Sequence, residues 1–580
     1  MTETEKKTGR RSRAAGRRQK RSSLPAILAF LALLLLLGGI GGGIYVEKFM
    51  PTRQLADLSE YFDVAGDNVQ VYLNDEKQRT EKDYLVVGRY RDGHVYLPYE
   101  FVLDKLNERF YWDAELTAFL YAMPTELQET AAEDVLSDGS AAFFTDGDKH
   151  YLNVDWIAEH TALSYQQYTD GEYKRIFLYN ADGEVTKAKL RRKESVRLKG
   201  GVKSEVLTTL SADSEVTILE AMDKWTKVVT PDGFIGYLRN SRLAEKETVQ
   251  RSYDYTEPEY THLLSEAEQK IGFWQVTNQS ANSSLAPLLG NTQGLTVLAP
   301  IWYALEGNEG GFRDLASAAA VSEAHAQGLS VWATVNNFDS GEVDEEAVLT
   351  KRSVREKLIT SLVQSAESVG IDGLNIDFES IPESLGRDYV EFMRELSISC
   401  RNAGIVLSAD CYVPYNYNAY YDIEELGKYC DYVVIMCYDE HYSGSETAGS
   451  VSSITYVDRG IEEAAAVISN AQVIIALPFY TRVWITAADG SLRSEAMGIA
   501  AAQSWISQKG VNLSWDEETG QNYGSIEDAD GRKEIWMEDA ESLALKLQHV
   551  REAGMGGTAY WKLGQEPAEI WNVINGTEGE

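Results

Sequence analysis

The last 310 or so residues alternate short apolar runs with amphipathic helical patterns, and this alternation limits the possible folds more than any other feature. The eight predicted strands are Ile271–Val276, Leu295–Ala299, Ser330–Val335, Ile371–Phe378, Val406–Cys411, Tyr432–Cys437, Val473–Leu477 and Thr558–Trp561. Eight strands alternating with helices over about 300 residues fit a (β/α)8 barrel, an α/β fold. We therefore expect such a barrel over residues 265–577.

Three helices between these strands are predicted at Phe312–Gln327, Val354–Val369 and Ala540–Ala553. The long gap between the seventh and eighth strands predicts a hairpin that pairs Asn512–Trp515 with Lys533–Trp536. In a barrel of this kind the chemistry lies at the carboxyl ends of the strands. Polar residues at those ends are therefore the candidates for a functional site.

The fourth predicted strand carries the most informative polar residues. Side chains of a strand alternate between its two faces, so Asn375, Asp377 and Glu379 share one face and Leu374, Ile376 and Phe378 share the other. In a closed barrel the acidic face points inward, where polar groups are costly unless they are hydrogen-bonded or used in chemistry. Glu379 is then expected at the mouth of the barrel, with Asp377 just below it.

A structural explanation of the same acids stays open at this point. The carboxylates could simply be capped or solvated residues at a strand end, or Glu379 could pair with a lysine or an arginine. The strand by itself does not decide between this reading and a catalytic one.

Four motifs in this region are similar to those of one enzyme family. Asp372-Gly-Leu-Asn-Ile-Asp-Phe-Glu379 resembles the D-G-x-D-x-D-x-E signature of glycoside hydrolase family 18. Met436-Cys-Tyr438-Asp439 resembles its M-x-Y-D motif on the sixth strand, and Leu477–Trp484 resembles its P-[FY]-Y-G-R-x-W segment. Trp561 stands where the eighth strand of the family supplies a tryptophan. The resemblance covers about Lys270 to Asn575 and is strongest to the spore-cortex-lytic and germination branch, where D-G-[VL]-N-I-D-F-E is usual.

This resemblance implies a role for each motif residue. Family 18 enzymes use the substrate's own 2-acetamido oxygen as the nucleophile, so they need one acid and a way to hold the acetamide. The resemblance makes Glu379 the general acid and later the base, and it makes Asp377 the acceptor of the acetamide N–H. Tyr438 would donate to the acetamide oxygen, and Trp561 would form an apolar floor for the sugar. The remaining implied substrate-binding residues are Asn375, Met436, Asp439, Tyr480 and Arg482.

The chain departs from the family pattern at two places. The family's middle aspartate is Asn375 here, which we expect to hydrogen-bond Asp377 without being able to take its proton, so that the pH optimum shifts. The S-x-G-G motif typical of chitinases on the third strand is replaced by Ala333–Asn337, which weakens a chitin assignment more than it weakens catalysis.

Aromatic residues at or near strand ends are candidates for lining a sugar cleft, although aromatic residues of a barrel often pack in its core instead. These residues are Trp274, Trp302, Tyr303, Trp332, Tyr412, Tyr415 and Tyr480. We expect about half of them to be core residues.

The N-terminal residues predict a membrane anchor. Leu24–Val46 is an uncharged stretch of 23 residues, which as a helix would reach roughly 34 Å and cross a bilayer core. Residues 1–50 contain ten basic residues and three acidic ones, and the basic tail 1–23 predicts a cytoplasmic N-terminus with the rest of the chain outside. A cleaved signal peptide is the competing interpretation. An uncleaved anchor over residues 24–46 is favoured because the run is long and no A-x-A-like site follows it.

The net charge of −36 separates into +7 for residues 1–50 and −43 for the rest. A strongly acidic chain does not resemble a nucleic-acid binder, because phosphate contacts need clustered Lys and Arg. No nucleic-acid partner is therefore expected, and the acidic portion should stay soluble beside a cell wall.

Two modules are predicted between the anchor and the barrel. Residues 59–190 contain an internal repeat with a period near 55, in which Asp92–Val102 resembles Asp146–Ile157. Each copy predicts a hairpin, a short helix and a returning strand, and the pattern resembles the stalk domain named after the N-terminal domain of copper amine oxidases, without implying copper. Residues 195–245 resemble a bacterial SH3-like domain, a small β-barrel that in its family often binds peptidoglycan. A packing spacer with Trp225 in its core is the alternative.

Cysteines and histidines give no sign of a metal site. The four cysteines, Cys400, Cys411, Cys430 and Cys437, form no C-x-x-C pair, and their confinement to one segment fits small buried core residues, with one disulfide left open. The seven histidines are scattered. No cofactor and no metal are therefore expected.

Two functions of different classes follow. The first is a membrane-anchored extracellular glycosidase that cuts β-1,4 bonds next to N-acetylglucosamine in peptidoglycan or chitin-like glycans. The second is a lectin-like barrel that binds such glycans without cleaving them. The retention of Glu379, Asp377 and Tyr438 favours the enzyme. Oligomeric state is left open.

Overall fold

The structure is a computed structural model that describes residues 24–339, 341 and 343–577 of the 580. The chain forms two compact units, one of Met1–Phe101 with Thr145–Tyr255 and one of Val102–Phe144 with Thr256–Glu580. The predicted basic tail, residues 1–23, lies outside the described residues.

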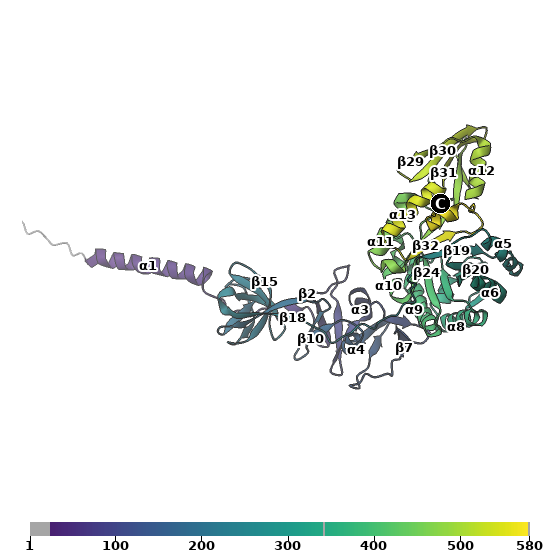
Figure 1. Cartoon of the computed structure of the whole chain (residues 1–580). Helices are drawn as coiled ribbons and strands as arrows, with labels where there is room; N and C mark the ends of the chain where they lie inside the picture. Colours follow the sequence, from purple (N-terminus) through teal and green to yellow (C-terminus); the bar gives the residue numbers. More distant parts are fainter. Residues whose placement is uncertain (1–23, 340, 342, 578–580) are drawn as a thin grey trace, which may run out of the picture. The chain divides into compact units, whose positions relative to one another are not determined.

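Helix α1 (Leu24–Lys48) begins the first unit and carries the predicted anchor (Figure 1). Its apolar side chains are exposed, and its stretch Ala26–Lys48 is long and apolar enough to cross a bilayer by length and composition. The predicted apolar helix is therefore present.

The first sheet of this unit contains most strands of the predicted repeat. In order its strands are β10 (Ser164–Tyr168), β11 (Lys174–Tyr179), β1 (Asn68–Leu73), β3 (Val87–Arg91), β4 (His94–Pro98), β9 (Lys149–Asn153) and β8 (Phe143–Asp146), with β2 (Glu76–Lys77) beside β1. The short helices are α2 (Leu58–Phe62), α3 (Tyr99–Lys105) and α4 (Val154–Glu159). Both predicted copies show a hairpin followed by a helix, namely β3–β4–α3 and β8–β9–α4.

The second sheet of this unit has seven antiparallel strands around a small apolar core that contains Val196, Val228 and Leu238. In order they are β14 (Val206–Leu210), β13 (Glu194–Arg197), β17 (Ile235–Arg239), β16 (Trp225–Val229), β15 (Glu215–Ala221), β12 (Gly183–Leu190) and β18 (Leu243–Arg251). The sheet extends beyond the predicted module 195–245 at both ends. Strand β12 lies in the predicted repeat region 59–190, and β18 continues to Arg251. Trp225 is half-buried, with the Arg239 guanidinium 5.8 Å from its ring centre.

The second unit is built on a closed parallel barrel. In order its eight strands are β19 (Gln269–Gln275), β20 (Val297–Glu306), β22 (Ser330–Asn336), β23 (Gly373–Asp377), β24 (Val406–Tyr412), β25 (Tyr432–Met436), β26 (Val473–Pro478) and β32 (Gly557–Trp561). Pairing of β19 with both β20 and β32 closes the barrel. The eight strands match the eight predicted ones, so the (β/α)8 barrel is confirmed.

Helices surround this barrel (Figure 1). They are α5 (Leu285–Leu289), α6 (Ala318–Ala326), α7 (Glu345–Leu349), α8 (Arg352–Val369), α9 (Gly386–Ala403), α10 (Ile423–Tyr429), α11 (Ile454–Ala465), α13 (Ala540–Glu552) and α14 (Ile570–Asn575). Gly370 and Gly404 end α8 and α9 with φ of 82° and 68°. Such left-handed turns favour glycine, and here they return the chain directly to β23 and β24.

Two predicted elements differ in the structure. Residues Gly311–Asp314 form a strand, β21, that pairs antiparallel with the end of β20, so the predicted helix Phe312–Gln327 begins only at Ala318, where Ser317 caps it. The predicted hairpin in the long seventh gap is also wrong. Strands β29 (Leu513–Asp516) and β31 (Gly531–Met537) each pair with a third strand, β30 (Gln521–Asp528). The sequence did not predict β30 because its residues are largely polar and partly exposed.

The β30 strand belongs to a five-stranded antiparallel sheet inserted between β26 and α13. Its order is β28 (Leu492–Gly498), β27 (Tyr480–Thr486), β31, β30 and β29, and helix α12 (Ile499–Lys509) follows β28. Strand β27 begins two residues after β26, so the insertion continues from the carboxyl end of a barrel strand.

Residues 102–144 form part of the second unit through a three-stranded sheet of β5 (Tyr111–Asp113), β6 (Ala118–Ala122) and β7 (Leu127–Thr130). Buried ion pairs join this segment to the barrel helices: Asp113 to Arg355, and Arg109 to Glu425. The first predicted repeat copy therefore ends in a strand, β6, that lies in a different sheet from β11, the returning strand of the second copy.

The two faces of β23 lie in different environments, as the period-two pattern predicts. Leu374, Ile376 and Phe378 belong to the apolar core between the barrel and its helices. A second apolar cluster includes Phe273, Trp332, Tyr432, Val434 and Ala476, against which Tyr438 and Trp561 pack. All four cysteines are buried and free in the first of these cores, which confirms their predicted core position without a disulfide.

Candidate active site

Asn375, Asp377 and Glu379 follow one another on one face of β23 and just beyond it. Asn375 and Asp377 are buried, with exposed fractions of 2% and 5%, whereas Glu379 is half-buried. The register places Asn336 of β22 opposite Asp377, and Ser408 of β24 opposite Asn375. The predicted row of polar groups is therefore present.

Glu379 is fixed by two residues from neighbouring strands. Its backbone N–H donates to Asn337 Oδ1, and its carbonyl oxygen accepts from Asn337 Nδ2, each at 2.9 Å. The Tyr412 hydroxyl donates to Glu379 Oε2 at 2.9 Å. No cation pairs with Glu379 among the described residues, so the ion-pair alternative is not what the structure shows.

Burial raises the pKa of the Glu379 carboxyl above its ordinary value. The hydrogen bond from Tyr412 opposes this shift because it stabilises the ionised form, and the negative charge of Asp439 adds to it. A carboxyl with a raised pKa keeps its proton closer to neutral pH and can donate it.

Asn375 does not hydrogen-bond Asp377, contrary to the expectation from sequence. Its Nδ2 donates to Asp410 Oδ2 at 2.8 Å, and its Oδ1 accepts from Ser408 Oγ at 2.6 Å. The reason is the register of β24, which places Ser408 beside Asn375 and Asp410 two residues further along the same strand. Asp410 is thus a third acid of this site, itself buried, and sequence reasoning missed it.

The pKa of Asp377 is raised well above its ordinary value, first by burial and then by the negative charges of Asp410, Glu379 and Asp339. Its Oδ1 is buried and has no hydrogen-bond partner among the described residues. A buried acceptor without a partner is costly, so this oxygen is suited to a ligand's N–H or to a shared proton.

The motif residues after β25 and β26 form a second cluster. Tyr480 donates to Asp439 Oδ1 at 2.6 Å, and Arg482 Nη2 lies 3.9 Å from the same oxygen. The ring of Tyr438 contacts that of Tyr480 edge to face, with centres 6.4 Å apart. Burial, with Asp410 and Asp377, raises the pKa of Tyr438, so it stays a hydroxyl donor.

Met436 and Trp561 complete the predicted set. Met436 is buried at the end of β25, where it pairs in register with Tyr412. Trp561 is half-buried at the end of β32, with its ring 5.6 Å from that of Phe273. The nine predicted site residues therefore lie on the barrel strands β23, β25 and β32, just after β23 and β25, and on β27, which continues from the carboxyl end of β26.

Five of the seven aromatic candidates are buried, Tyr480 among them, and the other two are half-buried. Trp274, Trp302, Tyr303 and Trp332 are buried in the two cores. Tyr412 and Tyr415 are half-buried and line a cavity of about 290 Å³ together with Arg459. Sequence reasoning assigned Tyr412 to the cleft only as one of seven aromatic residues, and it assigned no function to Asn337.

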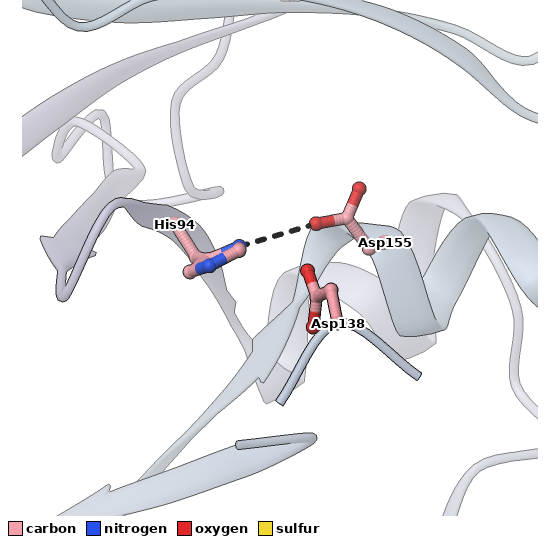
Figure 2. A group of neighbouring side chains, drawn as sticks. All are labelled: His94, Asp138 and Asp155. Carbon is pink, nitrogen blue, oxygen red and sulfur yellow. Dashed lines mark hydrogen bonds and ion pairs between the residues drawn. The ribbon is translucent and has the colours of Figure 1, made fainter. Parts of the chain in front are cut away.

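The first unit places a histidine next to a carboxylate, as Figure 2 shows. His94 Nδ1 lies 3.4 Å from Asp155 Oδ2. Asp138, also drawn there, belongs to the second unit. A single histidine–aspartate contact of this kind is common in proteins, and we assign no metal to it.

Comparisons with known proteins agree with the motif arrangement. The model of the family described as "Glycosyl hydrolases family 18" matches residues 271–566. A Bacillus subtilis protein named as a sporulation-specific glycosylase, YdhD, is 28% identical over 43% of this chain and 61% of its own length. A cortical fragment-lytic enzyme of Bacillus anthracis is 24% identical over 48% of this chain and 67% of its own length. The crystal structure of the Bacillus cereus spore cortex-lytic enzyme SleL is 23% identical, with a TM-score of 0.49 over 58% of this chain and 78% of that one.

Proposed function

Since the chain belongs to glycosyl hydrolases family 18, we propose that it is a membrane-anchored extracellular glycosidase that hydrolyses β-1,4 bonds next to N-acetylglucosamine. The observation that carries the proposal is the geometry of Glu379, a half-buried acid with a raised pKa that Asn337 and Tyr412 hold at the mouth of the barrel. One such acid beside a buried carboxyl is what substrate-assisted, retaining hydrolysis requires.

The proposed reaction has two steps. In the first, Glu379 gives its proton to the glycosidic oxygen as the bond breaks, and the 2-acetamido oxygen of the substrate bonds to the anomeric carbon. In the second, Glu379 takes a proton from the water that opens this oxazolinium ion, which regenerates the acid. Asp377 accepts the acetamide N–H and stabilises the positive charge, and Tyr438 donates to the acetamide oxygen.

The other predicted residues supply binding contacts in this proposal. Trp561 offers a flat apolar surface to the sugar ring. Tyr480 and Arg482 hold Asp439 from two sides, which keeps its carboxylate directed at the site. Asn375 and Met436 shape the pocket from below, since both are buried.

Peptidoglycan is the substrate we favour over chitin. The B. anthracis relative is named as a cortical fragment-lytic enzyme, and the residues Ala333–Asn337 replace the S-x-G-G motif of chitinases. Helix α1 would anchor the chain with residues from about Glu47 onward outside the cell, and the repeat region and the SH3-like module would act as a spacer and a wall contact.

The test is digestion by the full chain in detergent micelles, with purified sacculi and chitooligosaccharides as substrates. We expect release of fragments with N-acetylglucosamine at the new reducing end from sacculi. Cleavage of chitooligosaccharides alone would contradict the substrate, and binding of both glycans without any release would contradict the enzyme in favour of a lectin-like protein.

Tyr412→Phe is expected to move the alkaline limb of the kcat profile to higher pH. The hydroxyl of Tyr412 lowers the pKa of Glu379, so its removal raises that pKa and keeps the acid protonated at higher pH. The measurement is kcat against pH, with Tyr415→Phe as the matched control, because Tyr415 lines the same cavity but has no bond to Glu379. A limb that stays in place or moves to lower pH would contradict the assignment of Glu379 as the acid.

A further inference from the structure

Asp410 lies beside β23, the strand of Asn375 and Asp377, at a position outside the D-G-x-D-x-D-x-E signature. It stands on β24, is 3% exposed, and accepts a hydrogen bond from Asn375. Because Asn375 and Ser408 are opposite each other in the parallel register, Asp377 and Asp410 occupy the next inward positions on the two neighbouring strands. Two buried acids are therefore neighbours below Glu379.

The hydrogen bonds around Asn375 fix the direction of its amide. The Ser408 hydroxyl donates to Asn375 Oδ1, so the Asn375 NH2 group must point at Asp410 Oδ2. The second oxygen of Asp410, Oδ1, is buried without a hydrogen-bond partner among the described residues, as is Oδ1 of Asp377. Each acid thus has one unsatisfied buried oxygen.

Two neighbouring carboxyls in a buried site cannot both ionise at moderate pH, so the pair retains one proton. Burial raises the pKa of Asp410 to about 8, although the bond from Asn375 opposes the shift. The acids around the pair are Glu379, Asp339 and Asp439, and the phenols are Tyr412, Tyr438 and Tyr480. The guanidinium of Arg482 lies against Asp439.

We propose that Asp410 is a positioning residue that shares one proton with Asp377 and takes this proton when the substrate binds, and that it thereby supplies the acid that Asn375 lacks. With the proton on Asp410, Asp377 is ionised and free to accept the acetamide N–H. In this chain the acid stands on β24, and the amide of Asn375 on β23 donates to it across the two strands. This inference rests on the proposed function.

The Asp410→Asn variant tests this role. At alkaline pH the pair of the original chain loses its shared proton, and Asp410 becomes a negative neighbour of the other carboxyls. The variant lacks this charge, so the alkaline limb of kcat against pH moves to lower pH by about half a unit and follows a single ionisation. We expect kcat to fall about tenfold to a hundredfold, since Asp377 loses a charge-assisted hydrogen bond, with a smaller change in KM. Asp431→Asn is the matched control, a buried acid at the amino end of β25 that accepts from the backbone of Leu263 and Leu407. It should leave the limb in place.

The double variant Asn375→Asp/Asp410→Asn exchanges the amide and the acid across the same hydrogen bond. It restores the number of buried carboxyls, so we expect it to return the limb and much of kcat toward the original values. A limb that does not move in Asp410→Asn, or a double variant no better than Asp410→Asn alone, would overturn the proposal. If Asp410→Asn does not fold, the double variant alone decides, since loss of its activity would contradict the exchange.

Infrared spectroscopy of the full chain in micelles separates this inference from the proposed function, because it needs no turnover. We expect the band of a protonated carboxylic acid at neutral pH to be weaker in Asp410→Asn than in the original chain. An unchanged band would overturn the shared proton even in an active enzyme, and a weakened band in a chain that cleaves no glycan would support the shared proton while contradicting the proposed function.

Discussion

Replacing Glu379 with Gln is expected to lower kcat on sacculus fragments about a thousandfold, with little change in KM. Glutamine keeps the shape of the side chain, its backbone keeps both bonds to Asn337, and its amide oxygen can still accept from Tyr412. Only the transferable proton is lost. The variant should therefore bind glycans and stay folded while the glycosidic oxygen leaves without protonation.

The nature of the leaving group gives this prediction a second readout. An aryl glycoside with an acidic phenol leaves without a proton, so Glu379→Gln should lose less activity in its first step on that substrate than on a natural glycan. Glu383→Gln is the matched control, since Glu383 is exposed four residues further along the chain. A loss of less than about tenfold on the natural glycan would contradict Glu379 as the general acid.

The barrel and the acidic strand could be predicted from the sequence because both depend on local periodicity. The eight apolar runs became the eight strands, and the alternation in Leu374–Glu379 placed the acids on the inner face. The motif residues Tyr438, Tyr480 and Trp561 were found because each stands at a strand end with a family motif around it.

The partners of these residues could not be predicted, because they depend on register between strands. Asp410 sits in Ser408-Ala-Asp-Cys411, which contains no motif, and only the pairing of β23 with β24 places it beside Asn375. Asn337 and Tyr412 reach Glu379 from two different strands. The Asn375–Asp377 bond expected from sequence assumed that the neighbour along the strand was the partner, whereas the partner lies across the sheet.

Long-range packing is the other feature that sequence patterns missed. The predicted boundary at 265 separated the barrel from all earlier residues, yet residues 102–144 group with it in one compact unit. Their contacts combine buried ion pairs with one small apolar cluster, in which Ala122 packs with Ile398 and Tyr429, and no local periodicity of the sequence predicts either kind.

Arg355, at the start of α8, joins residues 102–144 to the barrel through a buried ion pair with Asp113. The side chains of Arg355 and Asp113 are both fully buried, and Arg355 Nη2 lies 3.0 Å from Asp113 Oδ2 and 2.9 Å from Glu395 Oε1. The other guanidinium N–H groups donate to Glu395, to the Leu349 carbonyl and to the Tyr111 hydroxyl. All five donors of Arg355 are thus satisfied.

Asp113→Ala is therefore expected to destabilise the second unit by about 3–5 kcal/mol, because it leaves part of a buried guanidinium without its partner. It also removes the acceptor of the Glu115 and Leu116 backbone N–H groups. Hydrogen exchange on peptides from α8 and β5, measured on the full chain, should show faster opening of both elements by the same free energy.

The matched control is Asp104→Ala, at an exposed position in the same segment, which should change the opening free energy by less than about 0.5 kcal/mol. Replacing Asp113, Arg355 and Glu395 together with Leu, Met and Leu should recover part of the loss, since the charges of this buried cluster are removed together, while Arg352 loses its contact with Glu395 and the Glu115 and Leu116 N–H groups still lack an acceptor. Faster exchange in β5 with unchanged exchange in α8 would contradict the claim that residues 102–144 stabilise the barrel.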